Sequence, residues 1–367
     1  MVKIIIAGGG TGGHLFPGIA VAEEFLKRDP QNNVLFIGTA RGLEKNILGE
    51  MGFPLRILDM EGIKGKGFRG TVRALLKIPK SLLSSFRIIR EFCPEIVIGC
   101  GGYASGPAVI VANFMGIKTA VAEQNALPGI TNRILGKFVD RVFLTFHETK
   151  KWFPEKKALV TGNPIRAAFF SRIIEQEGGS RKEGESFTIL VSGGSQGAHA
   201  INTAVIHAIE HLEEIKGQLR IIHQTGYNDL QEVSKVYRSY GIRAEVLSFI
   251  MDMASAFKEA DLLVCRAGAT TVAEITAMGK AAILIPFPFA VGDHQTRNAQ
   301  ALVKAKAAEM IPERELTGKG LAEVIKRFYR HPETLREMEV ISASLGNVRA
   351  ATAIVDACMA MVKGQTR

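Results

Sequence analysis

The sequence has few cysteines, few aromatic residues and no long apolar run. Its four cysteines, Cys93, Cys100, Cys265 and Cys358, are spread over 367 residues. They are too few and too scattered for a disulfide framework or a zinc site, and they fit a reducing cytoplasm. The longest uncharged apolar stretch, around residues 108–117, has about half of the roughly 20 residues that a spanning helix needs. We therefore expect a soluble protein, or one bound at a membrane surface without crossing it.

The composition is that of a globular protein with an excess of positive charge. It is 47% hydrophobic and 22% charged, which excludes a disordered or fibrous chain. The length suggests about two domains. A formal net charge of +10 points to an acidic partner, which is nucleic acid, an anionic membrane surface or a phosphorylated substrate.

The chain begins with a short apolar strand, a glycine loop and a helix. Lys3–Ala7 reads as a buried parallel strand, residues 8–13 hold five glycines, and a helix is expected from about Pro17 to Lys27. Further strands are expected at residues 33–37, 95–99, 118–122 and 141–145. Strands that alternate with helices in this way indicate an α/β domain with a parallel sheet.

The same pattern begins again in the second half. A shift of 185 residues places Lys3–His14 on Thr188–His199, with glycines and the final histidine in common. This internal repeat predicts an α/β fold of two Rossmann-like, doubly wound domains facing a central cleft, residues 1–164 and 165–344. The terminal segment, 345–367, is expected to pack back on the first domain. Its helix, at 347–362, should bury one face made of these residues: Ala351, Ile354, Val355, Cys358, Met359 and Val362.

Glycine loops at strand ends are typical anion sites, because backbone N–H groups and a helix N-terminus face the ligand. The first loop matches G-x-G-x-x-G, which alone is a weak signal, and the alternative is that its glycines only make tight turns. The second strand ends without the acid that binds a ribose. Arg41 is placed to accept a 2′-phosphate, so an NADP-dependent oxidoreductase remains an alternative.

Two other nucleotide-binding patterns are missing from the sequence. No loop is followed by the lysine of a P-loop, which argues against a P-loop NTPase. None of the eight aspartates lies two positions from another, so there is no D-x-D pair to hold a metal on a diphosphate. The charge of a nucleotide diphosphate would then be met by helix ends and basic side chains.

Seven motifs, in order along nearly the whole chain, resemble glycosyltransferase family 28. They are Gly9–Gly18, Gly101–Pro107, Glu123–Asn125, Gly162–Arg166, Gly193–Ala198, Cys265–Glu274 and Asp293–Ala299. The resemblance implies the two-domain fold called GT-B. It also implies a bacterial N-acetylglucosaminyltransferase of peptidoglycan synthesis, at the cytoplasmic face of the cell membrane. Members of the family commonly carry histidine before the Glu-Gln-Asn triplet, where this chain has Ala122.

The resemblance implies a role for each matching residue. On the first domain, which would take the acceptor, the residues facing the transferred sugar or the acceptor are Thr11, Gly12, Gly13, Tyr103 and Asn125. The second domain would take UDP-GlcNAc. Arg166 and Ser195 would contact the diphosphate, Ile250 would pack beside the uracil, and Gln295 would meet the GlcNAc ring. The residues under the nucleotide would be Ala269, Thr270, Thr271, Val272, Ala273 and Glu274. Glu274 would accept hydrogen bonds from the ribose hydroxyls. From the residues alone, a structural alternative stays open for each role. Glu274 could be a solvated helix carboxylate, and Arg166 could form a surface ion pair. Ser195 could be a helix cap, and Gln295 with Asn298 could belong to a polar surface.

The implied reaction moves GlcNAc from UDP-GlcNAc to the 4-hydroxyl of undecaprenyl-diphospho-MurNAc-pentapeptide, with inversion and without metal or cofactor. His14 is the candidate base, since histidine titrates near neutral pH, and Glu123 is the rival base. A capping or substrate-orienting histidine is the alternative for His14, and the matching His199 in the second copy favours that alternative. Another GT-B transferase, with a different sugar or acceptor, is the alternative to the whole assignment.

Residues 62–90 form a basic segment without any acidic residue. Its eight basic residues are Lys64, Lys66, Arg69, Arg73, Lys77, Lys80, Arg87 and Arg90. A helical wheel gathers apolar residues on one arc beside them, although Pro79 leaves two short helices as an alternative to one. Such a stretch suits an anionic inner-membrane surface, with peripheral attachment. The alternatives are a plain core face with solvated charges and a non-catalytic membrane or nucleic-acid module. We expect no nucleic acid, because only Phe68 and Phe86 offer rings for stacking on bases.

Overall fold

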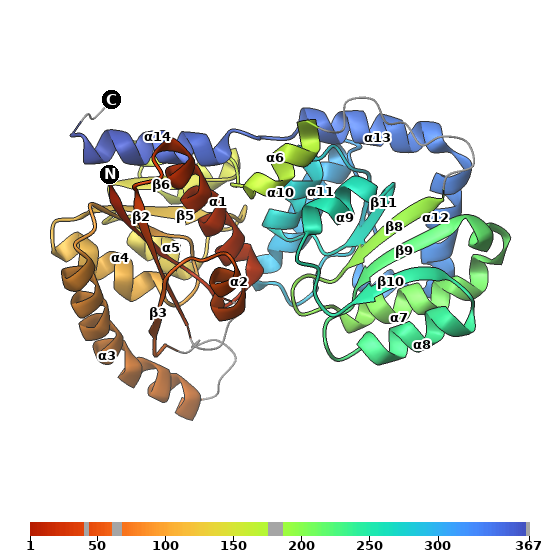
Figure 1. Ribbon diagram of the computed structural model, residues 1–367, viewed down its shortest axis with the longest axis horizontal. Helices are drawn as coiled ribbons and strands as arrows, with labels where there is room; N and C mark the ends of the chain where they lie inside the picture. Colours follow the sequence, from red (N-terminus) through yellow and green to blue (C-terminus); the bar gives the residue numbers. More distant parts are fainter. Residues whose placement is uncertain (40–43, 61–67, 175–185, 365–367) are drawn as a thin grey trace. The chain divides into compact units, whose positions relative to one another are not determined.

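The computed structural model describes residues 1–39, 44–60, 68–174 and 186–364, with the backbone alone for 68–76, 171–174 and 291 (Figure 1). The chain divides into two compact units. The first unit comprises Met1–Ala167 and Val348–Arg367, and the second comprises Ala168–Asn347. Arg41, residues 62–67 of the basic segment and most of the polar stretch between the repeats lie outside the described residues.

The first unit is built on a seven-stranded sheet in which every pair of neighbouring strands is parallel. Its order is β3-β2-β1-β4-β5-β6-β7. The strands are β1 Lys3–Ala7, β2 Asn33–Thr39, β3 Leu55–Leu58, β4 Ile96–Gly99, β5 Lys118–Glu123, β6 Arg141–Leu144 and β7 Ala158–Val160. The order reverses at β1 and β4, whose carboxyl ends carry the first two glycine loops. Ligands of doubly wound sheets bind at this switch point.

Helices cover both faces of this sheet. They are α1 Gly12–Arg28, α2 Glu44–Glu50, α3 Phe68–Phe92, α4 Ser105–Phe114, α5 Ile130–Leu135 and α14 Ala350–Val362, with a 3₁₀ helix at His147–Trp152. The helices α3, α4 and α5 pack side by side over one face, where Ile5, Val97 and Val109 share a buried core (Figure 1). The helices α1 and α14 pack against each other and cover the opposite face.

The prediction for the first helix was wrong in its start. The helix begins at Gly12 rather than near Pro17, so the proline lies inside the helix and the glycines of the loop form its first turn. For the basic segment, where one helix and two short helices were both open, the helix α3 continues through Pro79 as one element. A proline removes one backbone hydrogen bond and bends a helix, but the rest of the ladder and the packing on α4 keep this one continuous.

The last helix, α14, belongs to the first unit and lies on α1 and β5. Arg28 at the end of α1 donates to Asp356 at 2.6 Å and to the carbonyl of Thr352 at 3.1 Å. Of the expected apolar face, the residues Ala351, Ile354, Val355 and Cys358 are buried. Met359 and Val362 are only half-buried, because the buried stripe passes through Met361 instead.

The second unit repeats the plan with a six-stranded parallel sheet in the order β10-β9-β8-β11-β12-β13. Its strands are β8 Phe187–Ser192, β9 Leu219–Gln224, β10 Arg243–Leu247, β11 Leu262–Cys265, β12 Ala282–Leu284 and β13 Glu309–Met310. Its helices are α6 Ala167–Ile174, α7 His199–Ala208, α8 Leu230–Ser239, α9 Met253–Glu259, α10 Ala269–Ala277, α11 His294–Lys304, α12 Gly318–Arg330 and α13 Pro332–Ser344, with four 3₁₀ helices at Ile209–His211, Glu213–Gln218, Val291–Asp293 and Glu313–Glu315. The strands β8 and β11 stand where β1 and β4 stand in the first sheet, which confirms the internal repeat.

A buried polar network joins β9, α7 and α8 in the second unit. The imidazole of His223, with 0% exposure, places Nδ1 2.7 Å from the hydroxyl of Tyr237 and Nε2 3.0 Å from Oδ1 of Asn202. The side-chain amide of Asn202 donates to the carbonyl of Thr225 at 2.9 Å. Since Oδ1 of Asn202 can only accept, Nε2 donates to it, and in the neutral ring Nδ1 accepts from the hydroxyl of Tyr237. Burial lowers the pKa of His223 to about 3.

The low pKa of His223 predicts that the second unit loses stability in acid. In the folded state His223 stays neutral, whereas in the unfolded chain it takes up a proton below a pKa of about 6.5. Its contribution is therefore complete above pH 6.5 and falls by about 2 kcal/mol between pH 6.5 and pH 5. Urea unfolding followed by circular dichroism should show a smaller pH dependence for His223→Gln than for the wild type. Fluorescence of the single tryptophan, Trp152 in the first unit, should not differ between them. Equal pH dependence in both proteins would contradict the assignment.

Candidate functional site

In the first unit, the loops after β1 and β4 are in direct backbone contact. Gly102 has φ +78°, and a Cβ atom added to it would lie 2.3 Å from the carbonyl oxygen of Gly9. Only glycine permits both this φ and this approach. The contact brings together the predicted residues Thr11, Gly12 and Gly13 on one loop and Tyr103, which is 44% exposed, on the other.

His14 lies in the first turn of α1, where the two loops meet. Its ring lies against Gly101, since a Cβ atom added there would be 2.6 Å from Cδ2 of the imidazole and 2.9 Å from Nε2. Its Nδ1 is 3.3 Å from the hydroxyl of Thr11. The side chain is half-buried. The loops therefore fix the orientation of the imidazole and leave part of it open to solvent.

Sequence reasoning missed a buried acid beneath the first loop. Glu44, at the start of α2, is 1% exposed and accepts a hydrogen bond from the backbone N–H of Gly10. Its Oε1 lies where a Cβ atom of Gly9 would be, and its Oε2 is buried without a hydrogen-bond partner. An acid that binds a ribose is expected at the end of the second strand, whereas Glu44 lies five residues beyond Thr39 and its side chain reaches back to the first loop. The first loop is thus supported from below by a carboxylate.

Glu123, the rival base, is bound to its own loop. It ends β5, is 3% exposed, and accepts hydrogen bonds from the backbone N–H of Asn125 at 3.0 Å and of Gly129 at 3.0 Å. The side chains of Asn132 and Asn125 donate to it at 2.9 and 3.3 Å. Burial raises the pKa of Glu123, and the hydrogen bonds from Asn125, Asn132 and Gly129 oppose that rise. Both oxygens are engaged in holding the segment that carries Asn125.

In the second unit, the predicted donor residues follow the carboxyl ends of neighbouring strands. Ser195 lies in the loop after β8, Ile250 lies in the segment after β10, and Ala269–Glu274 begin α10 after β11. Glu274 is 6% exposed and lines a cavity of about 30 Å³ together with Ser192, Met253 and Thr271. A cavity of this size admits one or two oxygen atoms. It suits a hydroxyl group rather than a whole ring.

Gln295 and Asn298 both connect α11 to loops at this edge of the sheet. Oε1 of Gln295 accepts a hydrogen bond from the backbone N–H of Phe287 at 3.0 Å, after β12. The amide of Asn298, with 0% exposure, donates to the carbonyl of Ala267 at 3.1 Å, after β11. The two residues lie three positions apart on α11, and Asn298 is a buried brace rather than part of a polar surface.

Arg166 belongs to the first unit, apart from the other predicted donor residues in sequence and in unit. Its guanidinium stacks on the ring of Phe16, with Cζ 4.1 Å from the ring centroid. Next to it, Glu23 of α1 accepts a hydrogen bond from the N–H of Ala167 at 2.7 Å. Burial raises the pKa of Glu23, while that hydrogen bond and the charge of Arg166 oppose the rise. The stack holds the guanidinium at the end of the first unit.

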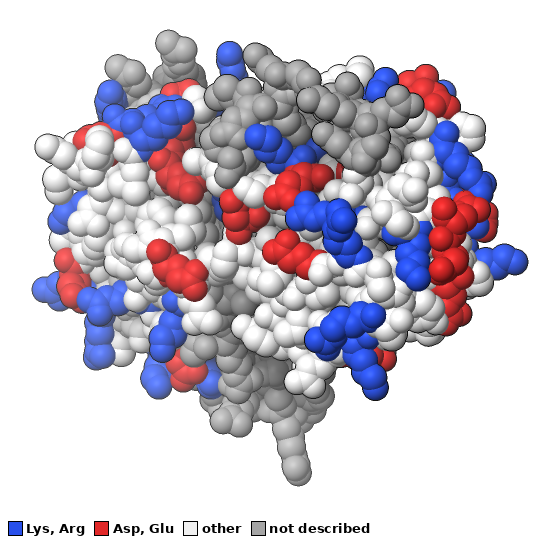
Figure 2. All heavy atoms as spheres, turned by 45° about the vertical axis from the view of Figure 1, so that its right-hand side comes forward, with Lys and Arg blue, Asp and Glu red and all other residues white. Residues whose placement is uncertain are grey.

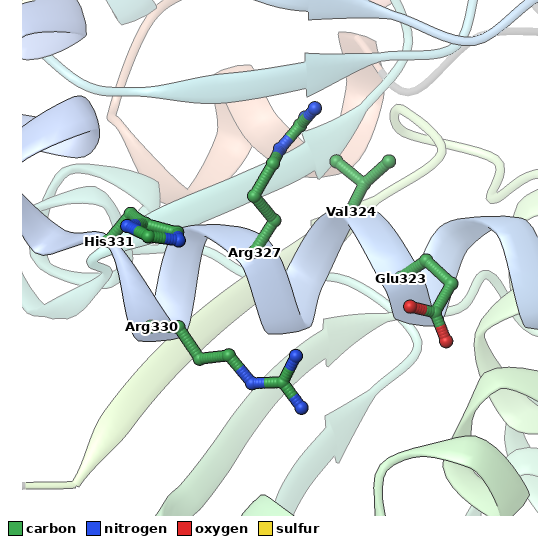
Figure 3. A pocket seen from close by; sticks show the side chains of 5 residues that line it. All are labelled: Glu323, Val324, Arg327, Arg330 and His331. Atoms are coloured by element: carbon green, nitrogen blue, oxygen red, sulfur yellow. The ribbon is translucent and has the colours of Figure 1, made fainter.

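A cavity of about 310 Å³ on the last turns of α12 lies away from these loops (Figure 3). The side chains that line it are Glu323, Val324, Arg327, Arg330 and His331. Arg327 pairs with Glu309, the first residue of β13, and Arg330 pairs with Glu214, which precedes β9. These partners mark the amino ends of the strands, the edge opposite the glycine loops. We therefore do not assign the donor site to this cavity.

Two doubly wound parallel sheets, each with glycine loops at its switch point, define the GT-B fold. Sequence profiles then give the family. The profile of the glycosyltransferase family 28 N-terminal domain matches residues 4–144, and that of the family 28 C-terminal domain matches residues 188–354. The chain belongs to glycosyltransferase family 28. Family membership decides for glycosyl transfer against the NADP oxidoreductase and the non-catalytic module.

Relatives match over the whole length of the chain. A UDP-N-acetylglucosamine--N-acetylmuramyl-(pentapeptide) pyrophosphoryl-undecaprenol N-acetylglucosamine transferase of Syntrophus aciditrophicus is 61% identical, over 99% of both chains. The protein of the same name from Myxococcus xanthus is 50% identical, over 98% of this chain and 93% of its own. The crystal structure of Acinetobacter baumannii MurG superposes with a TM-score of 0.73 at 31% identity, over 97% of this chain and 98% of that one. A putative UDP-N-acetylglucosamine 2-epimerase of Listeria monocytogenes, 14% identical with a TM-score of 0.71, shares the fold alone.

The contact between the two loops of the first unit predicts different costs for two glycine substitutions. Gly116 has φ +74° like Gly102, but nothing lies within 4 Å of an added Cβ atom. Gly116→Ala should cost about 1 kcal/mol of unfolding free energy for the positive φ alone. Gly102→Ala should cost a further 1–3 kcal/mol or so, because the Cβ atom meets the Gly9 carbonyl. Denaturant unfolding followed by Trp152 fluorescence measures both, and equal losses would contradict the contact.

Proposed function

We propose that this chain transfers GlcNAc from UDP-GlcNAc to the 4-hydroxyl of undecaprenyl-diphospho-MurNAc-pentapeptide, which converts lipid I to lipid II in peptidoglycan synthesis. The observation that carries the proposal is the 61% identity, over 99% of both chains, to a transferase named for this reaction. The glycine loops of both sheets support it, because each presents backbone amides at a switch point, where sugar nucleotides and diphosphates bind.

In this proposal the second unit holds UDP-GlcNAc and the first unit takes the acceptor. Ser195 and the amides of its loop face the diphosphate, and Ile250 packs beside the uracil. Glu274 supports this placement, because its carboxylate borders a cavity that fits a hydroxyl group and can accept hydrogen bonds from the ribose. Gln295 meets the GlcNAc ring, and Arg166 provides positive charge for the diphosphate.

We propose that the displacement is a single inverting step that uses no divalent cation. His14 takes the proton of the acceptor hydroxyl through Nε2, since its Nδ1 faces Thr11. Loop amides, the helix end and Arg166 stabilise the leaving UDP. Glu123 acts instead as a positioning residue, because both of its oxygens accept hydrogen bonds within its own loop.

Transfer of radiolabelled GlcNAc from UDP-GlcNAc to a lipid-linked muramoyl acceptor tests the reaction. The wild type should transfer with and without EDTA. His14→Ala should lower kcat about 10²–10⁴-fold with little change in KM, as expected on loss of a general base. The matched control is His199→Ala, the corresponding residue of the second repeat, which should retain its kcat. No transfer, or transfer that needs metal, would contradict the proposed reaction. A His14→Ala enzyme that loses only acceptor affinity would contradict the role of the base.

We also propose that the first unit attaches peripherally to an anionic membrane at the cytoplasmic face of the cell. Among the described residues, no helix combines the length and apolarity that a membrane crossing requires. Three packed helices carry exposed apolar side chains, which are Leu83 and Phe86 on α3, Phe114 at the end of α4, and Ile130 and Ile134 on α5. Their exposed fractions range from 39% to 85%, so they are not plain core.

Basic side chains accompany this apolar surface, but not all of them are available. Lys77 and Lys80 share Asp59, at 2.8 and 3.5 Å. Arg87 and Arg90 are exposed on the last turns of α3. On the face shown in Figure 2, by contrast, basic and acidic side chains are interspersed. The proposal therefore depends on Arg87 and Arg90 together with the apolar side chains.

Sedimentation with lipid vesicles tests the attachment. The double variant Arg87→Gln/Arg90→Gln should weaken binding to vesicles that contain anionic lipid by about 2 kcal/mol, roughly 30-fold. Leu83→Ser/Phe86→Ser should weaken binding to anionic and neutral vesicles alike. A matched control is Lys235→Gln/Arg238→Gln, a pair with the same spacing on α8 of the second unit, which should bind like the wild type. Binding that depends neither on anionic lipid nor on the two double substitutions in α3 would contradict the proposal.

A further inference from the structure

We propose that Gln224 is the positioning residue that sets the distance between the diphosphate end and the uracil end of the donor site. This inference rests on the proposed function, since it takes UDP-GlcNAc as the ligand of the second unit. Gln224 belongs to none of the seven family motifs, and in this proposal it does not contact the ligand. It acts through the two segments that it connects.

The side chain of Gln224 is buried, with 2% exposure, at the last position of β9. Its Nε2 donates to the carbonyl of Gly194 at 2.7 Å and to the hydroxyl of Ser192 at 3.3 Å. Its Oε1 accepts from the backbone N–H of Ile250 at 2.8 Å. One side-chain amide thus joins the loop after β8 to the segment after β10.

The strand order explains why a side chain at the end of β9 can reach both segments. The strand β9 lies between β8 and β10, in register with both, so its carboxyl end is flanked by the loops that follow those two strands. Gly194, with φ +92°, turns its carbonyl toward the amide of Gln224. Both hydrogen-bond partners of Gln224 lie in backbone segments that we propose to bind UDP. The Gly194 carbonyl belongs to the loop that would face the diphosphate, and the Ile250 N–H belongs to the segment that would lie beside the uracil.

Only an uncharged side-chain amide can donate a hydrogen bond to the loop after β8 and also accept one from the segment after β10. The loop after β8 offers oxygen atoms and needs a donor, whereas the segment after β10 offers an N–H and needs an acceptor. A glutamate would keep the bond to Ile250 but would set a carboxylate against the Gly194 carbonyl. A leucine would lose both bonds at nearly the same volume. The glutamate substitution therefore removes only the hydrogen bond to the loop after β8, whereas the leucine substitution removes the hydrogen bonds to both segments.

The expected consequence is a loss of coupling between the two ends of the nucleotide. A ligand that spans both segments gains from their fixed separation, because binding one end places the other. A ligand that occupies only the uracil segment gains nothing from it. Gln224→Leu should therefore weaken UDP much more than uridine, a pattern that general loss of folding does not produce.

Titration calorimetry with UDP, NMR titration with uridine and steady-state kinetics with UDP-GlcNAc test this inference on the full chain. We expect Gln224→Leu to raise the Kd of UDP and the KM of UDP-GlcNAc about tenfold or more, with uridine within about threefold and kcat within about threefold. Gln224→Glu should show an intermediate loss. The control is Tyr237→Phe, which removes a buried hydrogen bond to the adjacent His223 without touching either segment, and should bind UDP like the wild type.

Each outcome decides the inference. Wild-type affinity for UDP in either folded Gln224 variant would overturn it, as would equal losses for UDP and uridine. If Gln224→Leu does not fold, the comparison rests on Gln224→Glu against Tyr237→Phe, where equal UDP affinities would overturn the inference. A wild-type chain that does not bind UDP would overturn the proposed function itself, and the inference with it. Unchanged variants of a UDP-binding wild type would overturn the inference alone.

Discussion

Backbone-to-backbone contact between neighbouring glycine loops is the constraint on which both units depend. In the first unit, the Cα of Gly102 lies against the carbonyl of Gly9, and in the second a Cβ atom added to Gly197 would be 1.9 Å from the carbonyl of Thr225. Parallel strands end at one edge of a sheet, so the loops after adjacent strands must share the same space. A residue with a side chain at either position would push the loops apart. The backbone amides and helix ends at these loops are placed by these contacts.

Strand centres were predictable from the sequence because they lie in short apolar runs buried on both faces. Ile4, Ile5 and Ile6 of β1 are all at most 1% exposed. The edge strands β3 and β7 carry no such signal, since most of their side chains are half-buried or exposed. The start of α1 was missed for a different reason. Glycine and proline usually interrupt a helix, and only the fold shows that the glycines of this loop form its first turn.

The motif residues of the site were predictable in position but not in their partners. Glu123 was recognised, and its partners Asn125, Gly129 and Asn132 lie within nine residues of it, so a local pattern existed. The partners of Glu44 and Gln224 lie 26 to 34 residues away and are brought near by strand register. Single-sequence patterns carry no record of that register. What was missed is therefore a class of residue, the buried acid or amide that holds a loop from an adjacent element.

The excess positive charge of the chain is a weaker guide to its partner than its value suggests. Lys77 is 19% exposed in its side chain and pairs with Asp59, which also draws Lys80, so part of the charge of α3 is neutralised within the first unit. The pKa of Asp59 is lowered chiefly by its hydrogen bond with Lys77, so that carboxylate stays charged down to lower pH and keeps the pairing. Exposed charges act over about 10 Å at ordinary ionic strength, whereas burial of apolar side chains is not screened by salt. Attachment through α3, α4 and α5 would accordingly rely on Leu83, Phe86 and Phe114 for strength, and on Arg87 and Arg90 for the choice of an anionic surface.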